Sequence, residues 1–90
     1  MANWKYQINL ADIFERSEDQ PIETTAMEIY QRFATFMNNH SEMFEDEYSI
    51  EDTIDSIKYC ETNEEIDSAL SELYDFADQH RIWINTWEIA

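Results

Sequence analysis

Apolar residues recur at intervals of three and four positions in three segments of this chain, and this spacing limits the fold more strongly than any other feature. Such a repeat collects the apolar side chains on one side of an α-helix, and that side is buried against another element. The spacing predicts helices at residues 25–39, 50–60 and 63–79. The three apolar stripes are Ala26, Ile29, Tyr30, Phe33 and Met37, then Ile50, Ile54 and Ile57, and finally Ile66, Ala69, Leu70, Leu73 and Ala77.

Polar residues mark the starts of these helices. Thr25 with Glu28, and Thr62 with Glu65, each fit a capping box, in which the hydroxyl and the carboxylate accept backbone N–H groups of the first turn. Ser49 gives a similar signal ahead of the second helix, since an acid follows it three residues later. We therefore expect side-chain caps at all three helix N-termini.

The chain has no Gly, so other residues have to make its tight turns. Asn tolerates the left-handed conformation, and we expect Asn38 and Asn39 to end the first helix in this way. The one Pro, Pro21, marks the break before that helix. Residues 41–48 are predicted to form either a short helix with Phe44 pointing inward or an irregular link.

Both ends of the chain have strand character. Trp4, Tyr6, Ile8 and Leu10 alternate with polar residues, and this period of two is typical of a half-buried strand. Residues 81–87 are rich in β-branched and aromatic side chains and predict a second strand. Two single strands at opposite ends of a chain can satisfy their backbone groups by pairing with each other.

The expected fold is α+β and mostly α, with three to four helices and a two-stranded ribbon formed by the N- and C-terminal segments. Ninety residues make one small domain, residues 1–90, with one core. A short turn of helix carrying Ile13 and Phe14 is expected after the first strand. We expect the ribbon to bury Trp4, Tyr6, Ile82 and Ile84 and to place at least Trp83 or Trp87 in the core.

The charge of the chain is large and uneven. Asp and Glu number 21 against five Lys and Arg, which gives a net charge of −16. Residues 1–41 contain six acids and three bases, whereas residues 42–78 contain fourteen acids and only Lys58. Solubility requires a net charge of only about 2–8 in a small domain, so residues 42–78 carry more charge than solubility explains.

Helical geometry places most of these acids opposite the apolar stripes. The last two predicted helices therefore each present an acidic outer side, and a run of acids leads into the first of them. We expect a partner-binding surface consisting of Glu45, Asp46, Glu47, Glu51, Asp52, Asp55, Tyr59, Glu61, Glu64, Asp67, Glu72, Asp75 and Asp78.

A simpler interpretation remains open for this surface. Charged outer sides are ordinary for solvated helices, and acids in a first turn also interact well with the helix dipole. Tyr59 lies among the acids and is either an aromatic anchor for a partner or a residue beyond the helix end.

Catalytic and cofactor motifs are missing from the sequence. His40, His80 and Cys60 do not have the spacing of metal ligands, and the acidic run lacks the Gly and the spacing of a calcium-binding loop. Phosphate-cradling loops need Gly, which the chain does not contain. We therefore expect no enzyme activity, no cofactor and no metal.

The charge also limits the partners. Direct nucleic-acid binding needs cations, and anionic membranes repel a chain of this sign, so neither is expected. No apolar run is long enough to span a bilayer and no signal peptide is recognised, so the cytoplasm is the expected compartment. A basic nucleic-acid-binding protein is the expected partner.

Two segments carry a resemblance to known proteins. KYQINLADIF (5–14) and LYDFADQHRIWI (73–84) resemble the ends of small uncharacterised proteins of phages and mobile elements. In size, charge and helical make-up, the chain is also similar to DNA-mimic inhibitors, including anti-restriction and anti-CRISPR proteins. That similarity implies occupancy of a nucleic-acid channel in a defence enzyme, and it transfers no individual residue.

Three functions are compatible with these features. The first is a DNA mimic that occupies a basic groove without turnover. The second is an immunity protein or antitoxin that neutralises a basic toxin such as a nuclease, with Tyr48 and Tyr59 as anchors. The third is an adaptor or homodimer that uses exposed apolar residues near the C-terminus, namely Trp83, Trp87 and Ile89.

Overall fold

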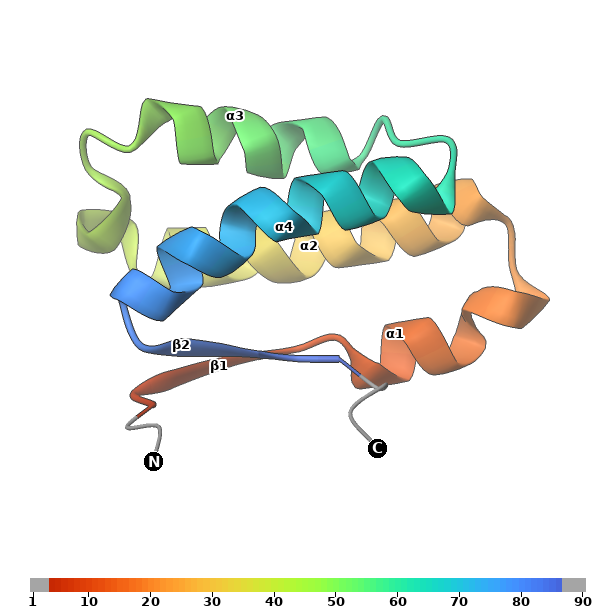
Figure 1. Cartoon of the computed structure of the whole chain (residues 1–90), viewed down its shortest axis with the longest axis horizontal. Coiled ribbons are helices and arrows are strands. Elements are labelled where there is room, and N and C mark those ends of the chain that lie inside the picture. Colours follow the sequence, from red (N-terminus) through yellow and green to blue (C-terminus); the bar gives the residue numbers. More distant parts are fainter. Residues whose placement is uncertain (1–3, 87–90) are drawn as a thin grey trace.

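The computed structural model describes residues 4–86, which form four α-helices and a two-stranded sheet (Figure 1). The predicted α+β, mostly α class is confirmed, as is the ribbon formed by the two ends of the chain. The elements in chain order are β1 (Tyr6–Asn9), α1 (Ala11–Arg16), a 3-10 turn (Ser17–Asp19), α2 (Ile22–Asn39), a second 3-10 turn (Ser41–Phe44), α3 (Tyr48–Ile57), α4 (Asn63–Gln79) and β2 (Ile82–Asn85).

The molecule has three levels. The sheet lies at one side, α2 and α4 cover it, and α3 packs on α2 and α4 away from the sheet (Figure 1). The strands are parallel, with Tyr6 opposite Ile82 and Ile8 opposite Ile84. Parallel strands need a long crossover connection, and here the four helices together provide it.

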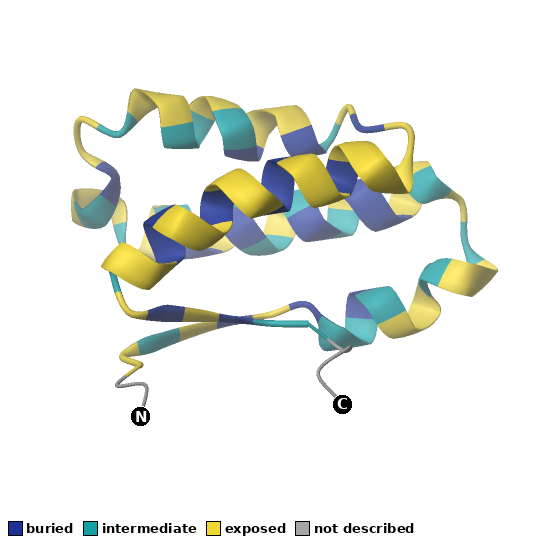
Figure 2. Ribbon diagram, in the orientation of Figure 1, coloured by how far each residue is buried: buried dark blue, intermediate teal, exposed yellow. Residues whose placement is uncertain are grey.

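The core lies between the sheet and the helices. Ile8, Ile82 and Ile84 point inward from the strands, and the buried sides of α2, α3 and α4 face one another (Figure 2). The predicted stripes are buried at Ile29, Phe33, Ile54, Ile57, Ile66, Leu70 and Leu73. A small domain gains most of its stability from this apolar burial, at roughly 25 cal/mol for each Å².

Two of the three predicted helix starts are wrong. Helix α2 begins at Ile22, directly after Pro21, so Thr25 lies within the helix and not at its cap. Thr25 is 1% exposed, and its hydroxyl accepts a hydrogen bond from Gln20 Nε2 at 3.0 Å. Helix α3 begins at Tyr48 and has no side-chain cap, so Ser49 does not cap it.

The capping signal before α4 is confirmed. Thr62 accepts a hydrogen bond from the backbone N–H of Glu65 at 3.1 Å. The Glu65 carboxylate accepts the backbone N–H of Glu61 at 2.6 Å, one residue earlier than the standard capping box. This geometry ties the α3–α4 connection to the first turn of α4.

The expected left-handed Asn residues are also wrong. Asn38 and Asn39 belong to α2, and its C-cap, His40, has φ −134°. Among residues 4–86, the left-handed positions are Asp46, with φ 65°, and Arg81, with φ 59°. Asp46 makes the turn into α3, and Arg81 makes the turn from α4 into β2.

The tryptophans differ from the prediction. Trp4 is 43% exposed, so its expected burial is wrong, and Trp83, one of the two alternatives for a core tryptophan, is 42% exposed. Ile82 and Ile84 occupy the inward positions of β2, and the period of two therefore sends Trp83 to the solvent side. Trp87 lies outside the described residues. The link after α2 is the short helix that was one of the two expectations, and its Phe44 is 3% exposed.

Candidate acidic interaction surface

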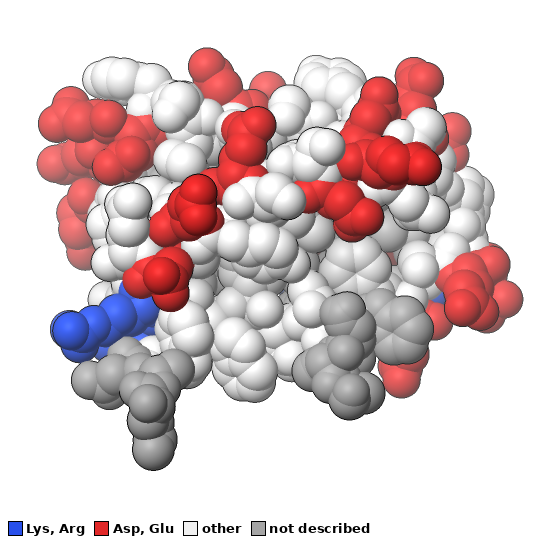
Figure 3. Space-filling model, viewed as in Figure 1, with Lys and Arg blue, Asp and Glu red and all other residues white. Residues whose placement is uncertain are grey.

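The acids of residues 42–78 lie on α3, on α4 and in the links beside these helices. In Figure 3 carboxylates form separate groups along the α3 side and along α4, with another group near the end of α1, whereas few of them lie toward the sheet. We call the thirteen predicted residues together the acidic surface. Twelve are carboxylates, of which ten are exposed, and Glu47 and Glu51 are half-buried.

A groove between α3 and α4 brings part of this surface together. It has a volume of about 550 Å³. Its lining residues are Asp52, Thr53, Ser56, Tyr59, Cys60, Glu64, Glu65, Ser68, Ala69 and Glu72. The predicted residues Asp52, Tyr59, Glu64 and Glu72 therefore border the same groove, and with Glu65 the groove has four carboxylates along it.

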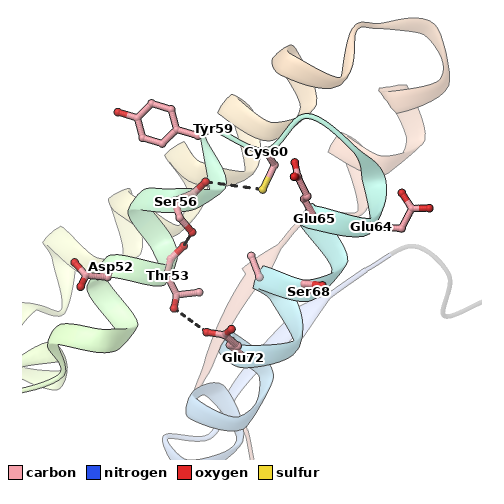
Figure 4. A pocket seen from close by; sticks show the side chains of 10 residues that line it. Asp52, Thr53, Ser56, Tyr59, Cys60, Glu64, Glu65, Ser68 and Glu72 are labelled. Carbon is pink, nitrogen blue, oxygen red and sulfur yellow. Dashed lines mark hydrogen bonds between the residues drawn. The ribbon is translucent and has the colours of Figure 1, made fainter.

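Hydroxyl groups form the inner wall of the groove (Figure 4). The Thr53 hydroxyl shares its one hydrogen between the backbone oxygen of Ser49, at 2.9 Å, and the Glu72 carboxylate across the groove on α4, at 3.0 Å. Ser56 donates to the backbone oxygen of Thr53 at 2.7 Å. Asp52 points away from α4 and Glu64 points away from α3 (Figure 4). The inside of the groove therefore combines hydroxyl groups with the apolar surface of Ala69 and Cys60, and its rims are acidic.

Cys60 closes one end of the groove. Its thiol is 3.8 Å from the backbone oxygen of Ser56, and the residue is 8% exposed. Burial, with a smaller contribution from the nearby Glu65 carboxylate, raises the pKa of the Cys60 thiol. A raised pKa disfavours the thiolate, which is the reactive form.

Lys58 is the single cation of residues 42–78. Its ammonium lies 3.1 Å from Asp55, 4.7 Å from the ring centre of Tyr30 and 5.4 Å from that of Tyr59. The hydrogen bond to Asp55 raises the pKa of Lys58. Because Lys58 pairs with Asp55, the acids along the groove receive no such pairing from it.

The arginines of the first half pair with other acids. Arg32 makes a two-pronged contact with the Asp12 carboxylate at 3.0 and 2.9 Å. Arg16 contacts both Asp12, at 3.3 Å, and Glu28, at 3.1 Å. These pairs lie at the α1–α2 junction, so they leave the α3 and α4 carboxylates unneutralised.

The remaining predicted residues do not lie in the groove. Asp67 lines a different hollow, of about 350 Å³, between α4, α1 and the end of β2. Asp46 makes the turn before α3, and Glu47 is the N-cap residue of α3. Tyr59, which does line the groove, follows the end of α3, as the simpler interpretation stated, yet it is 70% exposed.

Sequence reasoning missed the hydroxyl wall. Thr53 and Ser56 are three residues apart on α3, and Glu65, Ser68 and Glu72 follow at intervals of three and four on α4. That spacing places each set on one side of its helix. It gives no sign of which sides meet, because the contact depends on how α3 and α4 pack together.

Among residues 4–86, no group of three or more His, Cys, Asp or Glu side chains is arranged to hold a metal ion. In the same part of the chain, no helix combines the length and the apolar character needed to cross a bilayer. Comparisons of the chain with protein-family models, with curated proteins and with solved structures found no match.

Proposed function

We propose that this protein is an inhibitor that places its acidic surface in the nucleic-acid-binding groove of a basic protein, as a DNA mimic of the anti-CRISPR or anti-restriction type. The target is a defence enzyme or a host DNA- or RNA-binding protein in the cytoplasm. The mechanism is competition for a cationic site, with no catalytic turnover.

The observation that supports this proposal is the separation of acids from bases. Residues 42–78 contain fourteen acids, and their single base, Lys58, is paired with Asp55. Two further bases, Arg16 and Arg32, are paired at the α1–α2 junction. A surface with this much unpaired charge attracts cationic partners over long distances and accelerates their association.

The helices give the charges fixed positions. At about 1.5 Å of rise for each residue, the five acids of α4 that belong to the acidic surface, at positions 64, 67, 72, 75 and 78, follow one another at about 4.5–7.5 Å along its axis, and Glu65 is the sixth acid of this helix. One strand of duplex DNA presents a phosphate about every 3.4 Å of axis. Helix α4 alone is sparser than a DNA strand, and the acids of α3 on the other side of the groove add to its charge.

Rigidity increases the value of this arrangement. The contact between Thr53 and Glu72 ties α3 to α4, and the buried residues Ile54, Ile57 and Leu73 hold both helices on the core. Charges on a fixed scaffold lose less entropy on binding than charges on a loose tail. The folded α3–α4 pair is therefore a better competitor than an acidic peptide of the same composition.

Two exposed aromatic side chains favour a second candidate, an immunity protein or antitoxin. Tyr48 and Tyr59 are each 70% exposed and lie at the start and just beyond the end of α3. Tyr59 belongs to the acidic surface, and Tyr48 follows its member Glu47 in the chain. Tyr is enriched among the residues that dominate binding energy at protein interfaces. A toxin-neutralising interface would depend on these rings, whereas phosphate mimicry would depend on the carboxylates.

Charge reversal with a matched control tests the proposal. The variant with Glu64→Lys, Asp67→Lys and Asp75→Lys removes acids from α4, and the control with Glu15→Lys, Glu18→Lys and Glu23→Lys makes the same change of net charge at exposed sites elsewhere. Each immobilised protein is used to capture proteins from cells of its host, and bound proteins are eluted with duplex DNA and identified by mass spectrometry.

We expect the wild type and the control to capture nucleic-acid-binding proteins that DNA displaces, and the α4 variant to lose them. Equal loss in both variants would show that only total charge matters and would contradict a defined surface. Retention by the α4 variant, with loss after Tyr48→Ala and Tyr59→Ala, would favour the toxin-neutralising interface.

A further inference from the structure

Two acids of α4, Glu65 and Glu72, turn their side chains toward α3, whereas Glu64 points away from it (Figure 4). Glu65 reaches toward Cys60 at one end of the α3–α4 groove, and Glu72 meets Thr53 farther along it. Both acids line the groove. The groove therefore has a carboxylate at each of two separate places along its length.

Each of these two carboxylates is held by one of its oxygens. Glu65 accepts the backbone N–H of Glu61 at 2.6 Å, and Glu72 accepts the Thr53 hydroxyl at 3.0 Å. Within residues 4–86, the other oxygen of each carboxylate has no hydrogen-bond partner, and neither side chain forms an ion pair. One oxygen of each group thus fixes its position, and the other is available to a donor from outside the chain.

Small side chains line the groove between the two carboxylates. Ser68 and Ala69 follow Glu65 on α4, and Ser56 and Cys60 line the groove from the other side. Ala69 and Cys60 are each 8% exposed and form an apolar floor. The distance at which two helices pack depends on the side chains between them, so small residues here permit a close approach.

The separation of the two carboxylates matches a helix. Glu65 and Glu72 are seven residues apart on α4, which is about 10.5 Å along its axis. A helix that runs beside α4 places its own residues i and i+7 at the same separation and on one side. A strand places side chains of one side about 7 or 13 Å apart, and neither spacing fits. The geometry therefore favours a helix as the occupant.

We propose that the α3–α4 groove receives one helix of a basic partner protein. Two cationic side chains of that helix, two turns apart, bond to Glu65 and Glu72, and small or apolar residues between them cover Ser68 and Ala69. This inference rests on the proposed function and specifies where on the acidic surface the partner makes its central contact. Binding of a helix in a groove is a recurring form of peptide recognition.

Charge selects a cationic helix over an apolar one. Among the described residues, those that line the groove include four carboxylates and no Lys or Arg. The cation of the neighbouring chain segment, Lys58, is paired with Asp55. A hydrogen bond between an ionised donor and an ionised acceptor is roughly twice as strong as a neutral one. An apolar helix would instead cover the free carboxylate oxygens without supplying donors, which is costly.

Two helical peptides of equal charge test the spacing. Both are capped, rich in Ala and Gln and about 20 residues long, a length at which such sequences form helix in water. The first has two Arg seven residues apart, and the second has the same two Arg five residues apart, on different sides of the helix. Long-range attraction to the full-length protein is the same for both peptides. Their dissociation constants are measured by amide chemical-shift titration at one fixed NaCl concentration.

We expect the peptide with the seven-residue spacing to bind at least about fivefold more tightly and to shift amides on both walls of the groove. Glu72→Gln should remove this preference, because it removes one charge while its amide oxygen still accepts from Thr53. The matched control is Asp75→Asn, which neutralises an exposed acid of the same helix that does not line the groove. The control should keep the preference.

A second pair of variants fills the groove without changing its charge. Ser68→Leu occupies the space between the two carboxylates, and Ser71→Leu makes the same change at an exposed position of α4 that does not line the groove. We expect Ser68→Leu to weaken binding of the first peptide by at least about fivefold and Ser71→Leu to leave it unchanged.

Three results would each overturn the proposed groove contact. They are equal affinity for the two peptides, equal effects of the two variants in either pair, and shift changes spread evenly over the acidic surface. Each would mean that long-range attraction alone binds the peptides. Because the peptides replace the host partner, such a result leaves the proposed function to the capture experiment, and a capture experiment that fails does not alter the peptide result.

Discussion

The α1–α2 junction and the α3–α4 groove both gather carboxylates, and they use them in opposite ways. At the junction, the Asp12 carboxylate lies between two guanidinium groups, and Arg32 also donates to the backbone oxygen of Asn9 at 2.6 Å. At the groove, Thr53 is the hydrogen-bond donor to Glu72, and the nearby cation, Lys58, is paired with Asp55. The same residue types hold the fold together in one region and leave a surplus of charge in the other.

Titration behaviour reflects the paired region. The hydrogen bonds from Arg32, helped by its charge and by Arg16, hold the pKa of Asp12 well below its usual range. The hydrogen bond from Gln20, followed by the contact with Arg16, lowers the pKa of Glu28. A carboxylate whose pKa is lower in the folded protein than in the unfolded chain stabilises the native state. This stabilisation is complete at a pH above the pKa in the unfolded chain, and it is lost as the pH falls toward and through the pKa in the folded protein.

The largest effect that separates the two regions is expected for Asp12→Asn. This change removes the charge that faces Arg16 and Arg32, and at neutral pH it should lower the free energy of unfolding by about 1 kcal/mol, a value kept small because the side chains are partly exposed. Urea unfolding of both proteins measures the difference. A variant as stable as the wild type would contradict the stabilising role of the Asp12 contacts.

The pH dependence of that difference provides its control. The difference in the free energy of unfolding between the wild type and Asp12→Asn should be constant above about pH 5 and should shrink as the pH falls below about 4. Carboxylates away from the α1–α2 junction titrate alike in both proteins, so their contributions cancel in the difference, whereas Glu28 shares Arg16 with Asp12. A gap that persists to low pH would mean that Asp12 acts through packing and not through its charge.

The same chemical change in the other region should have a smaller effect of opposite sign. Asp75 is exposed on α4 among other acids, and Asp75→Asn removes one repelling charge without opening the core. We expect the free energy of unfolding to rise by up to about 0.5 kcal/mol at low salt, the usual range for surface changes. Urea unfolding at low ionic strength measures it, and a loss of stability would show that this acid is paired after all.

The sequence predicted the helices well because each one has to bury an apolar stripe. Ile54, Ile66 and Leu73 are each only 1% exposed, as their helical spacing predicted. The start of α2 was missed because Thr25 is held by Gln20 from the preceding turn, a contact that depends on the path of the chain after α1. Local capping rules do not include such contacts.

The strand pair was predictable and the fate of its tryptophans was not. In β2, Ile82, Trp83 and Ile84 are all apolar, so alternation fixes two opposite sides without showing which one faces the helices. The same limit applies to the candidate site. The spacing within each helix predicted which acids are exposed. It did not predict the groove that Asp52 and Glu72 both line, because this groove exists only where α3 packs beside α4.

Thermal unfolding of the wild-type protein at neutral pH, in roughly 10 mM and 500 mM NaCl, tests the central claim most directly, because salt screens repulsion between exposed charges. If residues 42–78 carry mainly unpaired acids, relief of their repulsion outweighs the weakening of the Asp12 and Glu28 pairs, and Tm rises with salt. A Tm that stays level or falls would mean that the pairs dominate and that no surplus of negative charge is available to a cationic partner.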